Sequence, residues 1–248
     1  PVEPISYLFG LVPVIKTNLE AFPGAWPFVL NQQGENLKGL TEMRSGGDRP
    51  NFDNAWLFWN YPVPGFPGDF LFELGTLGNT IVRSPGIAVD NSDVVYQFDT
   101  DPVLSPEEVA FNELVFRQIA DPQARNSNGL AQLPVTNGDL RVPMITVHNL
   151  GDLFVPVLNE IEYARRVAAK GKSDLLVQRA VRGVGHCDIT PVEFSNAFID
   201  LVNWVEYGMK PAGDNWLDPA NVAAPDFGCE FNDHGMHFFE EYCPLTNP

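Results

Sequence analysis

Residues 141–208 alternate between strand and helix patterns, and this alternation constrains the fold more than any other feature of the chain. The apolar, β-branched stretch "RVPMITVHN" predicts a buried strand, and "LNEIEYARRVAAKG" after it predicts a helix that ends at Gly171. The stretch "LLVQRAV" predicts a second strand, and a second helix follows at 190–208. Because strands joined by crossover helices form parallel sheets, the segment predicts an α/β fold.

The helix at 190–208 carries clear signals at both ends. Thr190 and Glu193 form a capping box, Pro191 suits the first helical position, and Gly208 suits the end. Apolar residues at helical spacing are expected to line one face of this helix: Phe194, Phe198, Leu201 and Val205.

The chain before residue 141 has a different character. Residues 1–104 are interrupted by Pro and Gly every few positions, which favours short helices and turns. A helix is predicted over 105–120, with Ser105 and Glu108 as its capping box. Its apolar side would consist of Val109, Leu114, Val115 and Ile119. We therefore divide the chain into 1–140, the α/β segment 141–208, and a tail at 209–248.

Two polar residues follow the two predicted strands. Asp152 lies just past the first strand, and His186, in the glycine-rich stretch "RGVGHCD", lies just past the second. Parallel neighbouring strands bring such turns to the same edge of the sheet. An aspartate there can hold the Nδ1 proton of a histidine that acts as a base through Nε2. Taken singly, the two residues are more simply read as a helix-capping aspartate and a structural turn histidine.

The stretches "VPMITVHNLGDLFVPV" and "LLVQRAVRGVGHCD" resemble the acid and base segments of the α/β-hydrolase superfamily, in particular secreted bacterial, actinobacterial-type esterases and lipases. The family order is nucleophile, acid, base, and Asp152 and His186 match the last two members. The resemblance implies a secreted serine hydrolase that cleaves carboxylic esters by acyl transfer and needs no cofactor. It covers only residues 141–208.

The serine nucleophile of such an enzyme is missing from the sequence. None of the eight serines lies in the G-x-S-x-G pattern of a nucleophile elbow. By family order, residues 1–140 would be a lid and its flanks, and the elbow would precede Pro1. We therefore expect the chain to be processed or cut from something larger, and to contain the C-terminal portion of a hydrolase. Four lid aromatics would either line an acyl pocket or form the lid's own core: Trp26, Trp56, Trp59 and Phe70.

A two-stranded parallel sheet is also incomplete on physical grounds. Two strands cannot bury both faces of such a sheet, and one edge would remain open. The expected partner is the N-terminal half of the same hydrolase, present as a second chain that brings the serine. The competing hypothesis is a non-catalytic binding or structural fragment derived from a hydrolase.

The three cysteines predict a disulfide in a secreted protein, with one thiol left over. The tail must fold back after Gly208, which predicts a bond between Cys187 and Cys229. Cys243 would then be free or bonded to the missing half. The alternative is three reduced cysteines.

The net charge of −17 disfavours nucleic acid and anionic membranes as partners. No apolar run reaches the length of a membrane-spanning helix. In the tail, His234 and His237 are spaced as weak metal ligands, but the ligands that zinc also needs are not evident, so a solvated tail is the better interpretation.

Overall fold

The computed structural model describes residues 17–22, 29–60, 90–122, 125–126, 129–130 and 136–244. The chain divides into two compact units. Unit 1 comprises Pro1–Met43 and Asp69–Thr136, and unit 2 comprises Arg44–Gly68 and Asn137–Pro248. The described residues 44–60, which the sequence analysis assigned to the first 140 residues, thus group with the α/β segment and the tail. No helix in the described parts of the chain is both long enough and apolar enough to cross a membrane.

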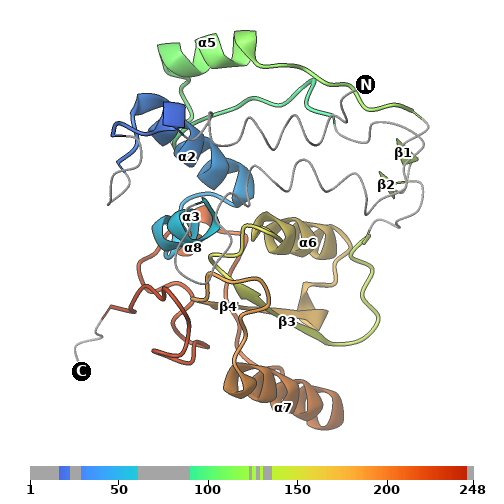
Figure 1. The fold of residues 1–248 in the computed structure, drawn as a ribbon. Helices are drawn as coiled ribbons and strands as arrows, with labels where there is room; N and C mark the ends of the chain where they lie inside the picture. The colour runs from blue at the N-terminus through green and yellow to red at the C-terminus, as the bar shows by residue number, and fades with distance from the viewer. Residues whose placement is uncertain are drawn as a thin grey trace, which may run out of the picture. The chain divides into compact units, whose positions relative to one another are not determined.

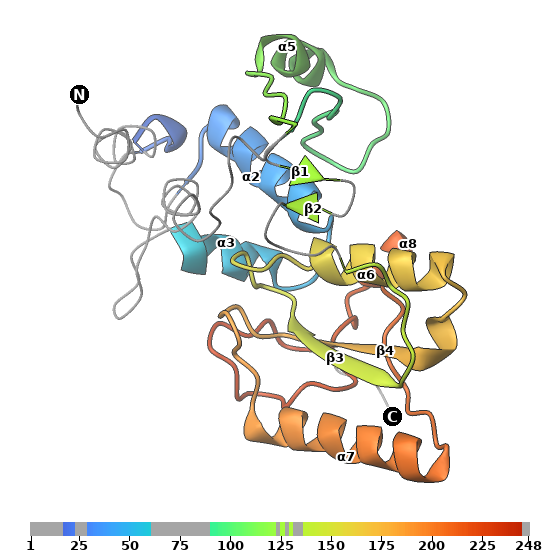
Figure 2. The ribbon, with the colours of Figure 1, turned by 90° about the vertical axis from the view of Figure 1, so that its right-hand side faces the viewer.

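Unit 2 is built around two parallel strands. Strand β3 (Met144–Asn149) pairs with β4 (Leu176–Val181), in a register that runs from Met144 opposite Leu176 to Asn149 opposite Val181. Helix α6 (Leu158–Ala169) covers one face of this sheet and α7 (Pro191–Tyr207) the other (Figures 1 and 2). The predicted α/β pattern is therefore present as a mixture of helices with a small parallel sheet.

The remaining elements of unit 2 are short. They are α3 (Phe52–Asn60), the 3-10 helix η2 (Ser173–Leu175) and α8 (Pro219–Val222). A buried cluster joins strand-end, α6 and tail residues: Leu150, Val157, Ile161, Ala180, Trp216, Val222 and Phe227. The tail is thus part of the core of unit 2 and not a solvated appendage.

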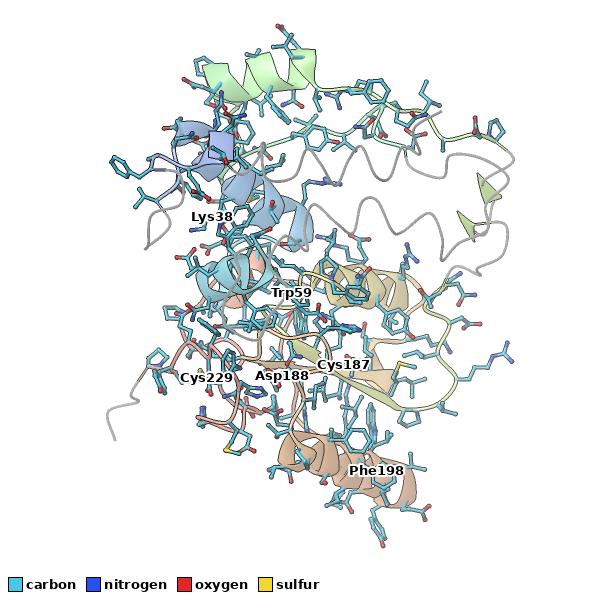
Figure 3. All side chains as sticks on the ribbon, in the orientation of Figure 1. Lys38, Trp59, Cys187, Asp188, Phe198 and Cys229 are labelled. Atoms are coloured by element: carbon cyan, nitrogen blue, oxygen red, sulfur yellow. A yellow bond between two sulfur atoms is a disulfide. The ribbon has the colours of Figure 1, made fainter. Side chains whose placement is uncertain are left out.

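The ends of α7 are as predicted. Thr190 and Glu193 form both bonds of the capping box, and Gly208 ends the helix with a φ of 72°. The orientation of the helix was not foreseen. Glu193, Ala197 and Trp204 are its buried residues, whereas the apolar stripe points outward, with Phe194 66% and Phe198 59% exposed. Figure 3 labels Phe198 on this helix. An amphipathic pattern shows that a face exists, but not which partner covers it.

One edge of the sheet is covered by the tail. Asp214 lies beside β4, where its backbone N–H donates to Gln178 O over 2.7 Å and its carboxylate accepts from Ala180 N over 2.7 Å. Among the residues that the structure describes, β4 is the one strand paired with β3. The predicted open edge of the sheet is therefore the far edge of β3.

Asp214 makes stability depend on pH. Burial is the largest cause of its raised pKa, and the charge of Glu230 raises the pKa further. The hydrogen bond from Ala180 N–H and the charge of Arg179 lower the pKa, but the net result is a rise from 3.8 to about 6. Since the folded state then binds the extra proton, stability should fall as pH rises from 3.8 through about 6.

We expect Asp214→Asn to raise the free energy of unfolding at neutral pH by about 1–3 kcal/mol, because the amide oxygen still accepts from Ala180 and carries no buried charge. Urea denaturation at several pH values measures this, with the exposed Asp174→Asn as control. A loss of stability at neutral pH would show that the charge itself is needed.

Unit 1 contains most of α2 (Gln32–Ser45), together with α5 (Pro106–Leu114) and the short antiparallel pair β1 (Arg125–Asn126) and β2 (Gly129–Leu130). The capping box of Ser105 and Glu108 is confirmed. The helix, however, ends at Leu114 and not at residue 120, and its expected apolar side is largely exposed, with Leu114 at 85% and Ile119 at 68%.

The buried residue of α5 is Glu108. One of its carboxylate oxygens caps the helix at Ser105, and the other accepts from Phe98 N over 2.6 Å. These backbone hydrogen bonds hold the pKa of Glu108 below its ordinary value. A carboxylate thus organises this part of unit 1, where sequence periodicity predicted an apolar contact.

Candidate active site

Asp152 and His186 meet at the carboxyl ends of the two parallel strands. His186 Nδ1 lies 2.8 Å from Asp152 Oδ2, so the predicted hydrogen bond is present. The Asp152 side chain is 4% exposed and the His186 side chain 41%. The second carboxylate oxygen of Asp152 accepts from the backbone amides of Phe154, over 2.8 Å, and Val155, over 2.9 Å. The aspartate is therefore fixed on one side by its own turn and directs its other oxygen at the imidazole.

The two turns approach so closely that glycine is required in them. A Cβ on Gly151 would lie 2.7 Å from Val184 Cα, and one on Gly183 would lie 2.5 Å from Asn149 Oδ1. Asn149, the last residue of β3, also donates from its side chain to Gly185 O over 2.9 Å. The glycines around His186 thus allow the base turn to pack directly against the acid turn.

Trp59 joins the same two turns from α3. Its indole Nε1 donates to Gly151 O over 2.8 Å and to Val184 O over 2.9 Å, next to the acid and two residues before the base. Trp59 and Trp56, which family order predicts to be lid aromatics, are both buried in unit 2. No sequence signal pointed to this bridge. Trp26 and Phe70 lie outside the described residues.

No serine completes the arrangement within the described part of the chain. There, no hydrogen bond joins a serine hydroxyl to His186 Nε2, which lies 3.7 Å from Cys187 Sγ. Ser45, the serine with glycines directly after it, is buried, and its hydroxyl accepts from Arg49 over 3.0 Å. Ser6, Ser84 and Ser127 lie outside the described residues.

The predicted disulfide pairing is wrong. Cys229 bonds to Cys243, and Cys187 is a free, exposed thiol. The tail folds back as expected, but the guanidinium of Arg182 donates hydrogen bonds to backbone carbonyls of both arms of the tail, at Phe227 and at Glu241, and so brings Cys229 beside Cys243. Cys187 stays in the base turn.

Alkylation tests this pairing. We expect iodoacetamide to modify one thiol per unreduced chain, on Cys187, and three after unfolding and reduction. Peptide mass mapping identifies the modified residue, and Cys187→Ser serves as the matched control. Modification of Cys229 or Cys243 without reduction would contradict the bond.

The two tail histidines differ in surroundings. His234 is 57% exposed by its side chain, whereas the side chain of His237 is 0% exposed. The interpretation of this stretch as solvated is therefore wrong for His237. Nε2 of His237 lies 2.7 Å from Glu193 Oε1, and Nδ1 lies 3.6 Å from Asp188 Oδ2. Among the residues that the structure describes, no group of three His, Cys, Asp or Glu side chains is arranged to hold a metal ion.

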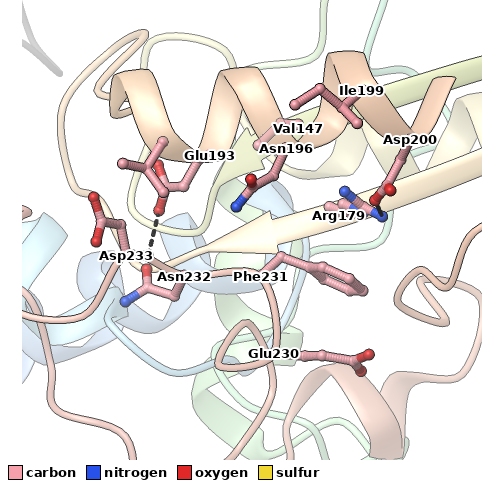
Figure 4. A pocket seen from close by; sticks show the side chains of 11 residues that line it. Val147, Arg179, Glu193, Asn196, Ile199, Asp200, Glu230, Phe231, Asn232 and Asp233 are labelled. Atoms are coloured by element: carbon pink, nitrogen blue, oxygen red, sulfur yellow. Dashed lines mark hydrogen bonds and ion pairs between the residues drawn. The ribbon is translucent and has the colours of Figure 1, made fainter. Parts of the chain in front are cut away.

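A polar pocket of about 320 Å³ lies between α7 and the tail, away from Asp152 and His186. Glu193 and Asp200 line it from α7, Arg179 from β4, and Phe231 from the tail (Figure 4). Arg179 is already paired with Asp200 over 2.5 Å and lies 4.3 Å from the Phe231 ring centroid. Residues of both α7 and the tail therefore line the pocket, and neither candidate catalytic residue is among its lining residues.

Comparison of the chain with protein-family models, curated proteins and solved structures finds no match.

Proposed function

We propose that the chain is the acid- and base-bearing portion of a secreted serine hydrolase of the α/β-hydrolase type, acting on carboxylic esters. The observation that carries the proposal is the 2.8 Å contact between His186 Nδ1 and Asp152 Oδ2 at the ends of adjacent parallel strands. The disulfide Cys229–Cys243 is compatible with secretion.

In this proposal His186 Nε2 takes the proton of a serine hydroxyl as the serine oxygen attacks the ester carbonyl. Asp152, whose second oxygen is occupied by two backbone amides, keeps the proton on Nδ1 and stabilises the imidazolium. The imidazolium then protonates the leaving alcohol. Water attacks the acyl-enzyme with the same base assisting, which releases the acid and restores the serine.

The serine is proposed to come from a polypeptide segment that lies outside this sequence. Two features of unit 2 support such a partner. The far edge of β3 has no strand beside it among the described residues, and α7, which packs against β3, exposes the stripe that includes Phe194, Phe198 and Val205. An open parallel edge next to an apolar helix face suits a partner that adds further parallel strands.

Isolation of the protein from its source tests the proposal. A second polypeptide with a G-x-S-x-G elbow should co-purify, and Phe198→Glu should release it. The control Met236→Glu changes an apolar residue of the tail that is slightly more exposed than Phe198, 66% against 59%, and should leave the complex intact. A partner without such a serine would favour the binding or structural role instead.

Within this proposal, only unit 1 corresponds to the lid. Residues 44–60, which the family order also assigned to the lid region, group with unit 2. In particular, Trp59 contacts the two turns that carry Asp152 and His186, and so belongs with the proposed catalytic framework.

A further inference from the structure

Asp188, two residues after His186 in the same turn, links this turn to His237 of the tail. The Asp188 carboxylate is 35% exposed and lies 3.6 Å from Nδ1 of His237, an ion-pair contact longer than a hydrogen bond. Asp188 also packs against the turn itself, because a Cβ on Gly185 would lie 3.1 Å from Asp188 Cβ. Asp188 therefore contacts both His237 and the base turn at Gly185, next to His186.

His237 links this aspartate to the start of α7. Its Nε2 donates to Glu193 Oε1 over 2.7 Å, and the same oxygen accepts from Asp233 N over 2.8 Å. The other Glu193 oxygen accepts from Thr190 N over 2.8 Å. Glu193 is thus shared between the cap of α7 and the tail.

The imidazole of His237 is charged at neutral pH. Burial opposes the charge, but the carboxylates of Asp188 and Glu193 outweigh burial and raise the pKa of His237 to about 10. Burial likewise opposes ionisation of Glu193, and the hydrogen bonds from His237, Asp233 and Thr190 hold its pKa below the ordinary value. The three groups therefore form a carboxylate–imidazolium–carboxylate cluster in which His237 and Glu193 are buried and Asp188 is partly exposed.

A disulfide joins the two ends of the tail loop that contains His237. The disulfide between Cys229 and Cys243 spans 14 residues and encloses His237. Buried ion pairs of this kind contribute little net stability because desolvation of the charges is costly. A role in fixing geometry accounts better for a fully buried charge at this place than a role in stability does.

We propose that His237 is a positioning residue for His186: through its contact with Asp188 it holds the base turn in the conformation that keeps His186 hydrogen-bonded to Asp152. The inference rests on the proposed function in so far as His186 is the base. The disulfide-closed loop 229–243 then acts on the base turn through His237 alone, and His237 does not contact the reacting atoms.

The test measures exchange of the His186 Nδ1 proton with water by NMR in the isolated chain. His237→Gln removes the charge and keeps a donor for Glu193. Asp188→Asn removes the other half of the contact and leaves the Glu193–His237 bond in place. His234→Gln, in the same loop but exposed, is the matched control.

We expect His237→Gln and Asp188→Asn each to speed this exchange by about tenfold or more, because each variant leaves a charged group of the cluster without one of its partners. The double variant should be no faster than either single one, since both remove the same contact. His234→Gln should change the rate by less than about twofold, as surface substitutions do.

An unchanged rate in Asp188→Asn would overturn the proposal, even if His237→Gln fails to fold, because His237 would then serve only the tail and α7. Additive effects in the double variant would overturn it as well. The measurement needs neither substrate nor a second chain. A negative result would therefore not contradict the proposed hydrolase function. Conversely, evidence against that function would not change the measured effect of His237 and Asp188 on His186.

Discussion

Replacement of His186 with alanine is expected to lower the turnover of the completed hydrolase by about 10⁴- to 10⁶-fold, the loss seen when a triad base is removed. The serine would then have no group to take its proton, while the carboxylate of Asp152 would remain buried without the imidazole. Steady-state kinetics with a p-nitrophenyl ester, on the complex with its serine-bearing partner, provides the measurement.

The matched control for this variant is His234→Ala. His234 is exposed and lies outside the Asp152–His186 pair, so its loss should leave turnover within about twofold of the wild type. If His186→Ala retained more than about one hundredth of the activity, the loss would be too small for a triad base, and His186 would be a structural turn residue.

The second large effect is expected at Arg182. Its side chain is fully buried and donates to the carbonyls of Phe227, over 2.9 Å, and Glu241, over 3.2 Å, as well as to those of Pro225 and Tyr242. Arg182→Ala should cost about 3–5 kcal/mol of unfolding free energy, because it leaves these tail carbonyls without donors and opens a cavity.

Urea denaturation followed by tryptophan fluorescence measures this loss, since Trp216 lies in the same core. The control is Arg165→Ala, which removes a half-exposed arginine paired with Glu162 within α6 and should cost less than about 1 kcal/mol. Equal losses in the two variants would mean that the tail is not held by the buried guanidinium.

Local sequence signals predicted strands β3 and β4 and helices α6 and α7 of unit 2 well. The capping box of Thr190 and Glu193, the end at Gly208 and the two parallel strands all follow from short-range rules, and the strand order brought Asp152 to His186. Such rules act within a few residues of the chain, so one sequence suffices to apply them.

The features that were missed depend on contacts between distant segments. Which face of α7 is exposed depends on its packing against β3. The pairing of Cys229 with Cys243 depends on the hydrogen bonds that Arg182 donates to carbonyls of the tail. The bridge from Trp59 and the buried imidazole of His237 join positions more than 40 residues apart. Neither has a local sequence pattern, because tryptophan and histidine serve many roles in cores and on surfaces.

Fluorophosphonate labelling tests the central claim most directly. The probe bonds to serines that a neighbouring base has activated, and intact-mass and peptide analysis then locate it. For the protein isolated with its partner, we predict one probe on a serine of the partner, no probe on the 248-residue chain, and loss of labelling in His186→Ala. Labelling of any of the eight serines in this chain, or labelling that persists without His186, would contradict the account.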